Sequence, residues 1–169
     1  MIRTLLVVGC LVLLAVCLYA MRRGWVRRGD RQSWLPAPAD VPVELSAPLL
    51  APLTGLYVGM TTTRSWQDRI VAHGLGLRAN ATATLHAQGL LIEREGADPV
   101  FIPVGSFVSA GVGAGLAGKV MGAGGLLIVR WALVDHEGTA TELDTGLRSD
   151  DKTVYPAWVR EIEKMGVSA

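Results

Sequence analysis

RANATATLHA, the stretch from Arg78 to Ala87, alternates strictly between polar and apolar side chains over ten residues. In an extended chain, successive side chains point to opposite faces, so a period of two is typical of a half-buried β-strand. The apolar face would carry Ala79, Ala81, Ala83, Leu85 and Ala87, and the polar face Arg78, Asn80, Thr82, Thr84 and His86. The stretch therefore predicts a β domain that buries one face of this strand.

Further candidate strands lie on both sides of this one, with short turn-forming segments between them. They are residues 55–60, 67–73, 90–95, 100–104, 126–134 and 139–147. Short strands at this spacing are typical of an antiparallel sandwich or barrel. The period becomes helical at residues 156–165, which place Trp158, Ile162 and Met165 on one side, with Pro156 in the first turn and Gly166 at the end. We expect a mainly β domain closed by one amphipathic helix.

The overall composition hides two unequal parts. The 169 residues are 50% hydrophobic and 18% charged, with a net charge of +1. Residues 4–21 carry no charge at all, whereas Arg3 and residues 22–31 hold 6 of the 16 basic and 1 of the 15 acidic residues. From Gln32 onward, 10 basic residues face 14 acidic ones, a net charge of −4. A mildly acidic body argues against nucleic-acid binding.

The uncharged segment 4–21 predicts a membrane anchor. Its 18 residues would form a helix of roughly 27 Å, close to the hydrocarbon thickness of about 30 Å. A cleaved signal peptide is the main alternative, but its apolar region is usually about 7 to 15 residues and ends in small residues. The sequence MRRGW at residues 21–25 is a poor cleavage site. We expect an uncleaved single span.

Arginines set the expected orientation of this span. Five follow it by residue 31 and one precedes it, so the positive-inside rule predicts that the C-terminal body faces the cytoplasm at the plasma membrane. Both cysteines, Cys10 and Cys17, lie inside the span and leave no disulfide or zinc site for the body. The predicted membrane-interface residues are Arg22, Arg23, Trp25, Arg27 and Arg28.

The chain divides into three expected parts. Residues 1–24 form the anchor with its flanks, residues 25–53 form the basic collar and a linker with five prolines, and residues 54–166 form the β domain. The linker composition favours an extended spacer that holds the body off the membrane. Residues 99–118 are uncharged and allow a second span as an alternative, although two prolines and five glycines favour buried strands and a glycine loop.

The glycine-rich segment GAGLAGKV at residues 113–120 resembles phosphate-binding motifs. A phosphate loop would need Ser or Thr after Lys119, and Val120 stands there instead. A dinucleotide motif would need a βαβ unit, which the strand pattern does not offer. We interpret residues 111–125 as a flexible hairpin loop, and its candidate partner residues are Gly113, Gly115, Gly118 and Lys119.

Residues with catalytic chemistry are scattered. His73, His86 and His136 have no ligand spacing, and the pair Glu93 and Glu95 favours solvated edge charges over an acid/base pair. The acidic residues just before the C-terminal helix suggest helix capping and a local ion pair. The sequence therefore predicts no enzyme, no cofactor and no metal site.

Seven short motifs carry a family resemblance. They are GLYVG at 55–59, SWQDRI at 65–70, GLGLR at 74–78, GKV at 118–120, LDTG at 143–146, DDK at 150–152 and YPAWV at 155–159. Together they resemble a family of small actinobacterial single-span membrane proteins whose soluble part is a bacterial pleckstrin-homology-like (PH-like) domain. Some members carry transporter or export labels, and the family is similar to one encoded beside pyrimidine-biosynthesis genes.

The resemblance implies two packed antiparallel sheets of about seven strands capped by a C-terminal helix, which Trp158 would anchor. It does not bring phosphoinositide binding with it, because residues 60–65 supply one arginine. We expect a non-enzymatic, membrane-tethered module that faces the cytoplasm and binds a protein or peptide that the sequence does not identify. The alternative is an accessory subunit of a membrane transport or export complex, in which the anchor packs against other spans.

Overall fold

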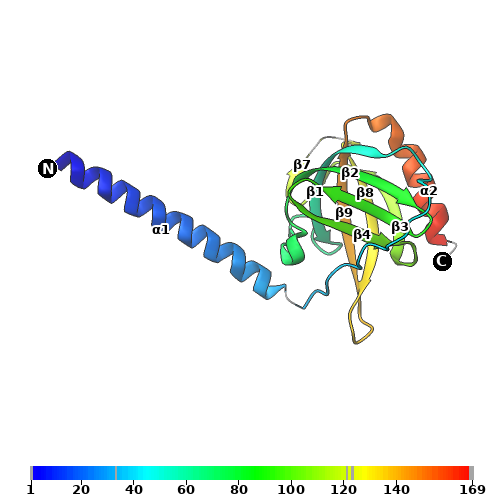
Figure 1. Cartoon of the computed structure of the whole chain (residues 1–169), viewed down its shortest axis with the longest axis horizontal. Coiled ribbons are helices and arrows are strands. Elements are labelled where there is room, and N and C mark those ends of the chain that lie inside the picture. The colour runs from blue at the N-terminus through cyan, green and yellow to red at the C-terminus, as the bar shows by residue number, and fades with distance from the viewer. Residues whose placement is uncertain (1, 33, 121, 123, 168–169) are drawn as a thin grey trace.

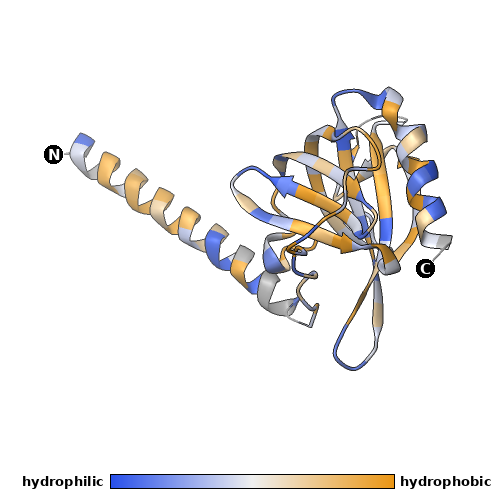
Figure 2. Cartoon of the chain, turned by 45° about the vertical axis from the view of Figure 1, so that its right-hand side comes forward, coloured by the Kyte–Doolittle hydropathy of each residue, from blue (hydrophilic) through white to orange (hydrophobic). Residues whose placement is uncertain are grey.

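The computed structural model describes residues 2–32, 34–120, 122 and 124–167. A single long helix, α1 (Ile2–Arg31), projects from a compact β body (Figure 1). Figure 2 shows that the first part of α1 is largely hydrophobic and that hydrophilic residues gather toward its C-terminal end. Within the described residues, Leu6–Gly24 is the one helical stretch long and apolar enough to cross a membrane.

The body is a seven-stranded antiparallel sheet that curls around a core (Figure 1). The strands follow the order β4-β3-β2-β1-β9-β8-β5, and a small two-stranded hairpin, β6-β7, is separate from them. The mainly β fold with about seven strands and a C-terminal helix, α2 (Tyr155–Val167), is confirmed. The strands are β1 (Leu53–Thr62), β2 (Ala79–His86), β3 (Gly89–Arg94), β4 (Ala97–Pro103), β5 (Phe107–Gly113), β6 (Gly115–Leu116), β7 (Lys119–Val120), β8 (Leu126–Val134) and β9 (Ala140–Ser149).

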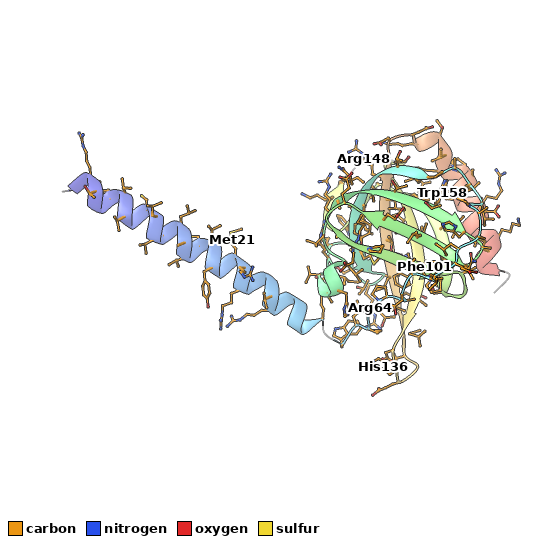
Figure 3. All side chains as sticks on the ribbon, in the orientation of Figure 1. Met21, Arg64, Phe101, His136, Arg148 and Trp158 are labelled. Atoms are coloured by element: carbon orange, nitrogen blue, oxygen red, sulfur yellow. The ribbon has the colours of Figure 1, made fainter. Side chains whose placement is uncertain are left out.

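Apolar side chains from the sheet and from α2 meet in one main core. Trp131 on β8 and Trp158 on α2 are the largest fully buried side chains. Figure 3 places Trp158 where α2 packs against the strands, and the indole of Trp131 donates a hydrogen bond to Thr145 Oγ1 at 2.9 Å. Burial of Trp158 and Ile162 on one side of α2 follows from the helical spacing of these residues.

The structure confirms β2 as the strand that the alternation of residues 78–87 predicted, but part of its polar face is buried too. Ala81, Ala83 and Leu85 are buried in the core as expected. Thr84 and His86, from the polar face, are buried as well. The preceding segment covers this end of the strand, since the Ser46 carbonyl lies 2.7 Å from His86 Nδ1 and the Leu49 N–H donates to the Leu85 carbonyl.

Residues 67–73 were expected to be a strand, and this prediction is wrong. The segment is a loop that ends in the short 3₁₀ helix η1 (Ala72–Gly74), with one isolated bridge between Arg69 and Thr61. Ile70, Val71 and Ala72 are all buried. The Val71 and Ala72 N–H groups donate to Gln32 Oε1 instead of to a neighbouring strand, so no β ladder continues through the segment.

The proline-rich segment is extended, but it packs on the barrel rather than standing free of it. Leu35 is 1% exposed and belongs to the main core. Ala39 bridges to Phe101 at the edge strand β4, and Ser46 accepts a hydrogen bond from the Ala87 N–H. The linker therefore covers one open edge of the sheet.

Residues 99–118 form strands rather than a second membrane helix. β4 and β5 occupy most of the segment, joined by the 3₁₀ helix η2 (Val104–Ser106). Pro103 and Gly113 end these two strands, and Gly105 lies in η2. The strand interpretation is confirmed, although β5 buries only Phe107.

Candidate functional site

An open groove of about 850 Å³ lies on the outer face of strands β3, β2, β1 and β9. Because Tyr57, Ala81 and Ile92 point into the core, their neighbours along each strand point outward into this groove. The cross-strand register places Thr54 opposite Thr82, and Thr82 opposite Glu93. Strand spacings of about 4.8 Å make the groove roughly 14 Å wide.

Charged side chains stand at both sides of the groove over a polar floor. Glu93 and Glu95 line the β3 side, whereas Arg148 and Asp150 line the β9 side. Glu95 is held in place, because Asn80 Nδ2 donates to its Oε2 at 2.9 Å. The two salt bridges among the described residues lie elsewhere, so Glu93 and Arg148 are available to a ligand.

Arg94 also lines the groove, but its guanidinium is engaged in hydrogen bonds that stabilise the fold. Its guanidinium donates to the Asp98 carbonyl from Nε (2.9 Å) and Nη2 (2.6 Å), and to the Gly74 carbonyl from Nη1 (2.8 Å). Cζ lies 5.0 Å from the ring centroid of Tyr57. Burial raises the pKa of Tyr57 well above its ordinary value, and its hydroxyl donates to the Leu75 carbonyl at 2.6 Å.

The predicted glycine loop is an ordered hairpin where the structure describes it. Gly113 ends β5, Gly115 and Lys119 lie in β6 and β7, and Gly118 lies in the turn between these two strands. The turn has positive φ at Ala117 (54°) and Gly118 (71°), the geometry that joins tightly paired strands. Residues 121 and 123 of the predicted loop lie outside the described residues.

Leu116 fixes this hairpin to the outer face of the sheet. It packs with Val58 and Leu126 in a second, smaller apolar cluster. Gly146 on β9 makes the contact possible, because a Cβ added there would come within 2.6 Å of Leu116 Cδ2. The hairpin is therefore a packed element of the fold and not a free loop.

Arg69 ties the hairpin to the β1–β2 loop. Its Nη1 donates to the Gly76 carbonyl at 2.7 Å and its Nη2 to the Ala117 carbonyl at 3.5 Å. Partial burial lowers the pKa of Arg69 from its ordinary value, although an arginine this basic stays charged at neutral pH. One side chain thus holds together two segments that are 48 residues apart.

The family comparison agrees with this architecture. Residues 34–163 match the family model described as Bacterial PH domain-like. The chain belongs to this family. None of the functionally characterised proteins compared with the chain matches it. The matched region begins with the segment that packs on the barrel and ends within α2, so it covers the whole PH-like domain.

The predicted membrane-interface residues precede the PH-like domain on α1. Arg22, Arg23 and Arg27 are exposed, and Arg23 Nη1 lies 3.4 Å from the Tyr19 hydroxyl. Trp25 and Arg28 also belong to α1, but their side chains lie outside the described part of the structure. Their contact with lipid stays a prediction.

The three histidines of the PH-like domain do not form one site. His73 and His86 each hold a linker carbonyl, that of Leu35 and that of Ser46, at 2.7 Å, and His136 is at the tip of the β8–β9 hairpin (Figure 3). Among the described residues, no group of three or more His, Cys, Asp or Glu side chains is placed to hold a metal ion. Two of the histidines thus attach the linker to the domain.

The sequence predicted helix capping and a local ion pair before α2. The structure confirms the capping, but the ion pair has a different partner. Capping before α2 is confirmed at the 3₁₀ helix η3 (Lys152–Val154), where Asp151 Oδ1 accepts from the Thr153 N–H at 2.9 Å. Asp144 pairs with Arg130 across two strands and not with the nearby Arg148. Sequence reasoning missed Arg130 and Arg69, because their partners lie on other elements and no local spacing marks them.

Proposed function

We propose that this protein is a membrane-tethered binding module whose PH-like domain holds a protein or peptide segment in the groove on β3, β2, β1 and β9. PH-like domains are typically non-catalytic binding modules, and the groove is an open concave surface of about 850 Å³ on the described domain. In this proposal residues 1–24 are the anchor, residues 25–53 connect it to the barrel, and residues 54–166 form the binding domain.

The observation that carries the proposal is the set of exposed charges beside the groove. Glu93, Glu95 and Asp150 oppose the single exposed cation Arg148, a net charge of −2. Unpaired charges of both signs around a polar floor favour an extended segment that is polar and carries basic side chains. A groove about 14 Å wide accommodates one extended strand with its side chains.

The tether supports a role at the membrane. Leu6–Gly24 is long and apolar enough to span a bilayer, and no part of this stretch is buried against the body. The excess of arginines after the span favours a cytoplasmic PH-like domain at the plasma membrane. A tethered module would search for its partner in two dimensions, close to the lipid surface.

Photo-crosslinking from the groove tests the proposal in native membranes. A benzophenone amino acid replaces Thr82 in the full chain, and the matched control carries it at the exposed Glu163 on α2. We expect a protein adduct from position 82 that is absent from position 163. Adding Glu93→Lys to the same chain should reduce the adduct severalfold, because the substitution replaces an acidic side chain that would attract the basic segment with a cation that repels it.

Two results would argue against this proposal. Equal adducts from both positions, or an adduct of the same yield in the Glu93→Lys chain, would show that the groove does not select the partner. The alternative function, an accessory subunit of a membrane transport or export complex, is favoured by the unburied surface of Leu6–Gly24. Scrambling residues 4–21 at constant hydrophobicity would abolish the function of such a subunit but preserve that of a generic tether.

A further inference from the structure

The charges of the body are strongly segregated. Residues 63–78 and 114–120 contain four of the ten basic residues that follow residue 31, namely Arg64, Arg69, Arg78 and Lys119. They contain one of the fourteen acidic residues, Asp68. The two segments together therefore carry a net charge of +3, while the rest of the body, with six basic and thirteen acidic residues, carries −7.

The two basic segments form one surface. The Gly118 N–H donates to the Trp66 carbonyl at 3.3 Å, and Arg69 donates to carbonyls on both segments. The tip of the β6–β7 hairpin is thus attached to the β1–β2 loop. Lys119 and Val120 on β7 therefore lie in the same region of the surface as Trp66 and Arg64.

Large apolar side chains are exposed among these cations. Trp66 is 46% exposed and Val120 is 72% exposed, although either residue type is usually buried in a soluble domain. Tryptophan is enriched where a membrane protein meets the water–lipid interface, because its ring is apolar and its N–H is polar. We call Arg64, Trp66, Lys119 and Val120 the Trp66 surface.

The Trp66 surface lies on the side of the barrel from which α1 projects. Figure 1 shows β7 on this side and α2 on the opposite side, and Figure 3 shows Arg64 at the lower edge of the barrel, between the C-terminal end of α1 and the β8–β9 hairpin. The residue directly after α1 is attached to the same loop, because Gln32 Oε1 accepts from the Val71 N–H at 2.7 Å and Gln32 Nε2 donates to the Arg69 carbonyl at 3.2 Å.

The length of α1 brings this side of the barrel to the bilayer. Seven residues of helix follow Gly24 up to Arg31, which corresponds to about 10 Å at a rise of 1.5 Å per residue. The headgroup layer on each side of the hydrocarbon core is roughly 5 to 8 Å thick. The barrel therefore begins within a few ångströms of the lipid surface.

We infer that the Trp66 surface is a second membrane contact, in which Trp66 and Val120 enter the headgroup layer of an anionic bilayer and Arg64 and Lys119 bind lipid phosphates. The inference rests on the membrane anchoring proposed above. The contact is interfacial and does not select one headgroup, because its cations Arg64 and Lys119 are exposed and the partly buried guanidinium of Arg69 already donates to backbone carbonyls.

Fluorescence of the full chain in liposomes tests the contact. In a Cys10→Ala, Cys17→Ala background, a single cysteine at Val120→Cys carries an environment-sensitive probe, and a matched chain carries it at Glu163→Cys on α2. Vesicles of phosphatidylcholine alone are compared with vesicles containing phosphatidylglycerol, each with headgroup spin-labelled lipid. We expect strong quenching at position 120 in anionic vesicles and little at position 163.

Further variants and a separate insertion assay distinguish a failure of the Trp66 surface contact from a failure of the membrane anchor. Arg64→Glu with Lys119→Glu should remove the quenching at position 120, whereas Lys152→Glu with Arg160→Glu, a charge reversal away from this surface, should leave it. Carbonate extraction of the same samples reports insertion of α1 separately. An inserted chain without quenching at position 120 would overturn the second contact alone, and a chain that carbonate extracts would overturn the anchor on which it rests.

Quenching that is equal in neutral and anionic vesicles would show an apolar contact without the inferred phosphate binding, and so would overturn this part of the inference. Intrinsic tryptophan emission of each variant before and after urea shows whether its barrel is folded. A variant that loses quenching with a native emission maximum supports the contact.

Discussion

Arg94 lies over the ring of Tyr57 with its Cζ 5.0 Å from the ring centroid, and the two side chains close one end of the barrel. Neither group is paired with a carboxylate, since Arg94 donates to the carbonyls of Gly74 and Asp98 and Tyr57 donates to that of Leu75. This end of the barrel is therefore closed by hydrogen bonds to loop backbone. The β1–β2 loop and the start of β4 are held to each other through one guanidinium.

Replacement of Arg94 should destabilise the domain far more than replacement of an exposed arginine. Arg94→Ala leaves buried carbonyls without donors, and we expect a loss of about 2 to 4 kcal/mol in the free energy of unfolding. Arg148→Ala, on the groove surface, should change it by about 0.5 kcal/mol or less. Urea unfolding of the full chain in detergent, followed by tryptophan emission, measures both. Equal losses would show that the bonds of Arg94 do not hold this end together.

The proline-rich segment should behave as part of the domain in one place and as a linker in another. Leu35→Ala removes a side chain that is buried in the main core, and we expect it to cost about 2 to 4 kcal/mol. Val43 is fully exposed in the same segment, so Val43→Ala is the matched control and should have almost no effect. Thermal unfolding of the two variants compares them directly. A Leu35→Ala chain as stable as the control would mean that the segment does not pack on the barrel in solution.

The cross-strand pair of Arg130 and Asp144 offers a double-mutant cycle. The guanidinium donates from Nε to Oδ1 at 2.8 Å and from Nη2 to Oδ2 at 3.0 Å, and the bond to Asp144 raises the pKa of Arg130. Because the side chain of Arg130 is 40% exposed, we expect a coupling energy of only about 0.5 to 1 kcal/mol, which declines in high salt. Arg130→Ala alone should cost more than this, since it leaves a mostly buried carboxylate unpaired. A coupling that is unchanged by salt would contradict the assigned ion pair.

Asp151 should give the helix end a pH-dependent stability. Hydrogen bonds from Thr153 hold the pKa of Asp151 below its ordinary value, so its ionised form favours the folded state. The contribution is fully present above the unfolded pKa of about 3.9, and it is lost as the pH falls through the lower folded value. Asp151→Ala should lower the melting temperature by about 2 to 5 °C at pH 7. The difference from the unmodified chain should shrink toward pH 3, and a difference that is constant with pH would refute the capping role.

Strands and helices whose signal is local could be predicted from the sequence. The alternation of residues 78–87 located β2, and the apolar run 126–134 coincides with β8. Residues 67–73 misled the prediction because three consecutive apolar residues resemble a strand in composition, whereas their burial depends on contacts with Met60 and Gln32. Such contacts join positions far apart in the chain and leave no periodic trace.

The candidate site was less predictable than the fold, for the same reason. Glu93 and Glu95 were noted as exposed charges near a strand end, and the structure keeps both exposed. Their position opposite Arg148 depends on the register of four strands, which alternation alone does not fix. The glycine segment was expected to be a flexible loop, but Leu116 and Arg69 hold it to the sheet through contacts that only the folded chain brings together.

The attachment of Gln32 to the β1–β2 loop has a mechanical consequence. Because Gln32, the residue directly after α1, is bonded to the backbone of Arg69, Val71 and Ala72, we expect the helix and the barrel to rotate together about the helix axis. The rotation of α1 about its own axis then sets the direction in which the barrel faces in the plane of the membrane. A neighbouring membrane helix that rotated α1 about its axis would rotate the groove through the same angle.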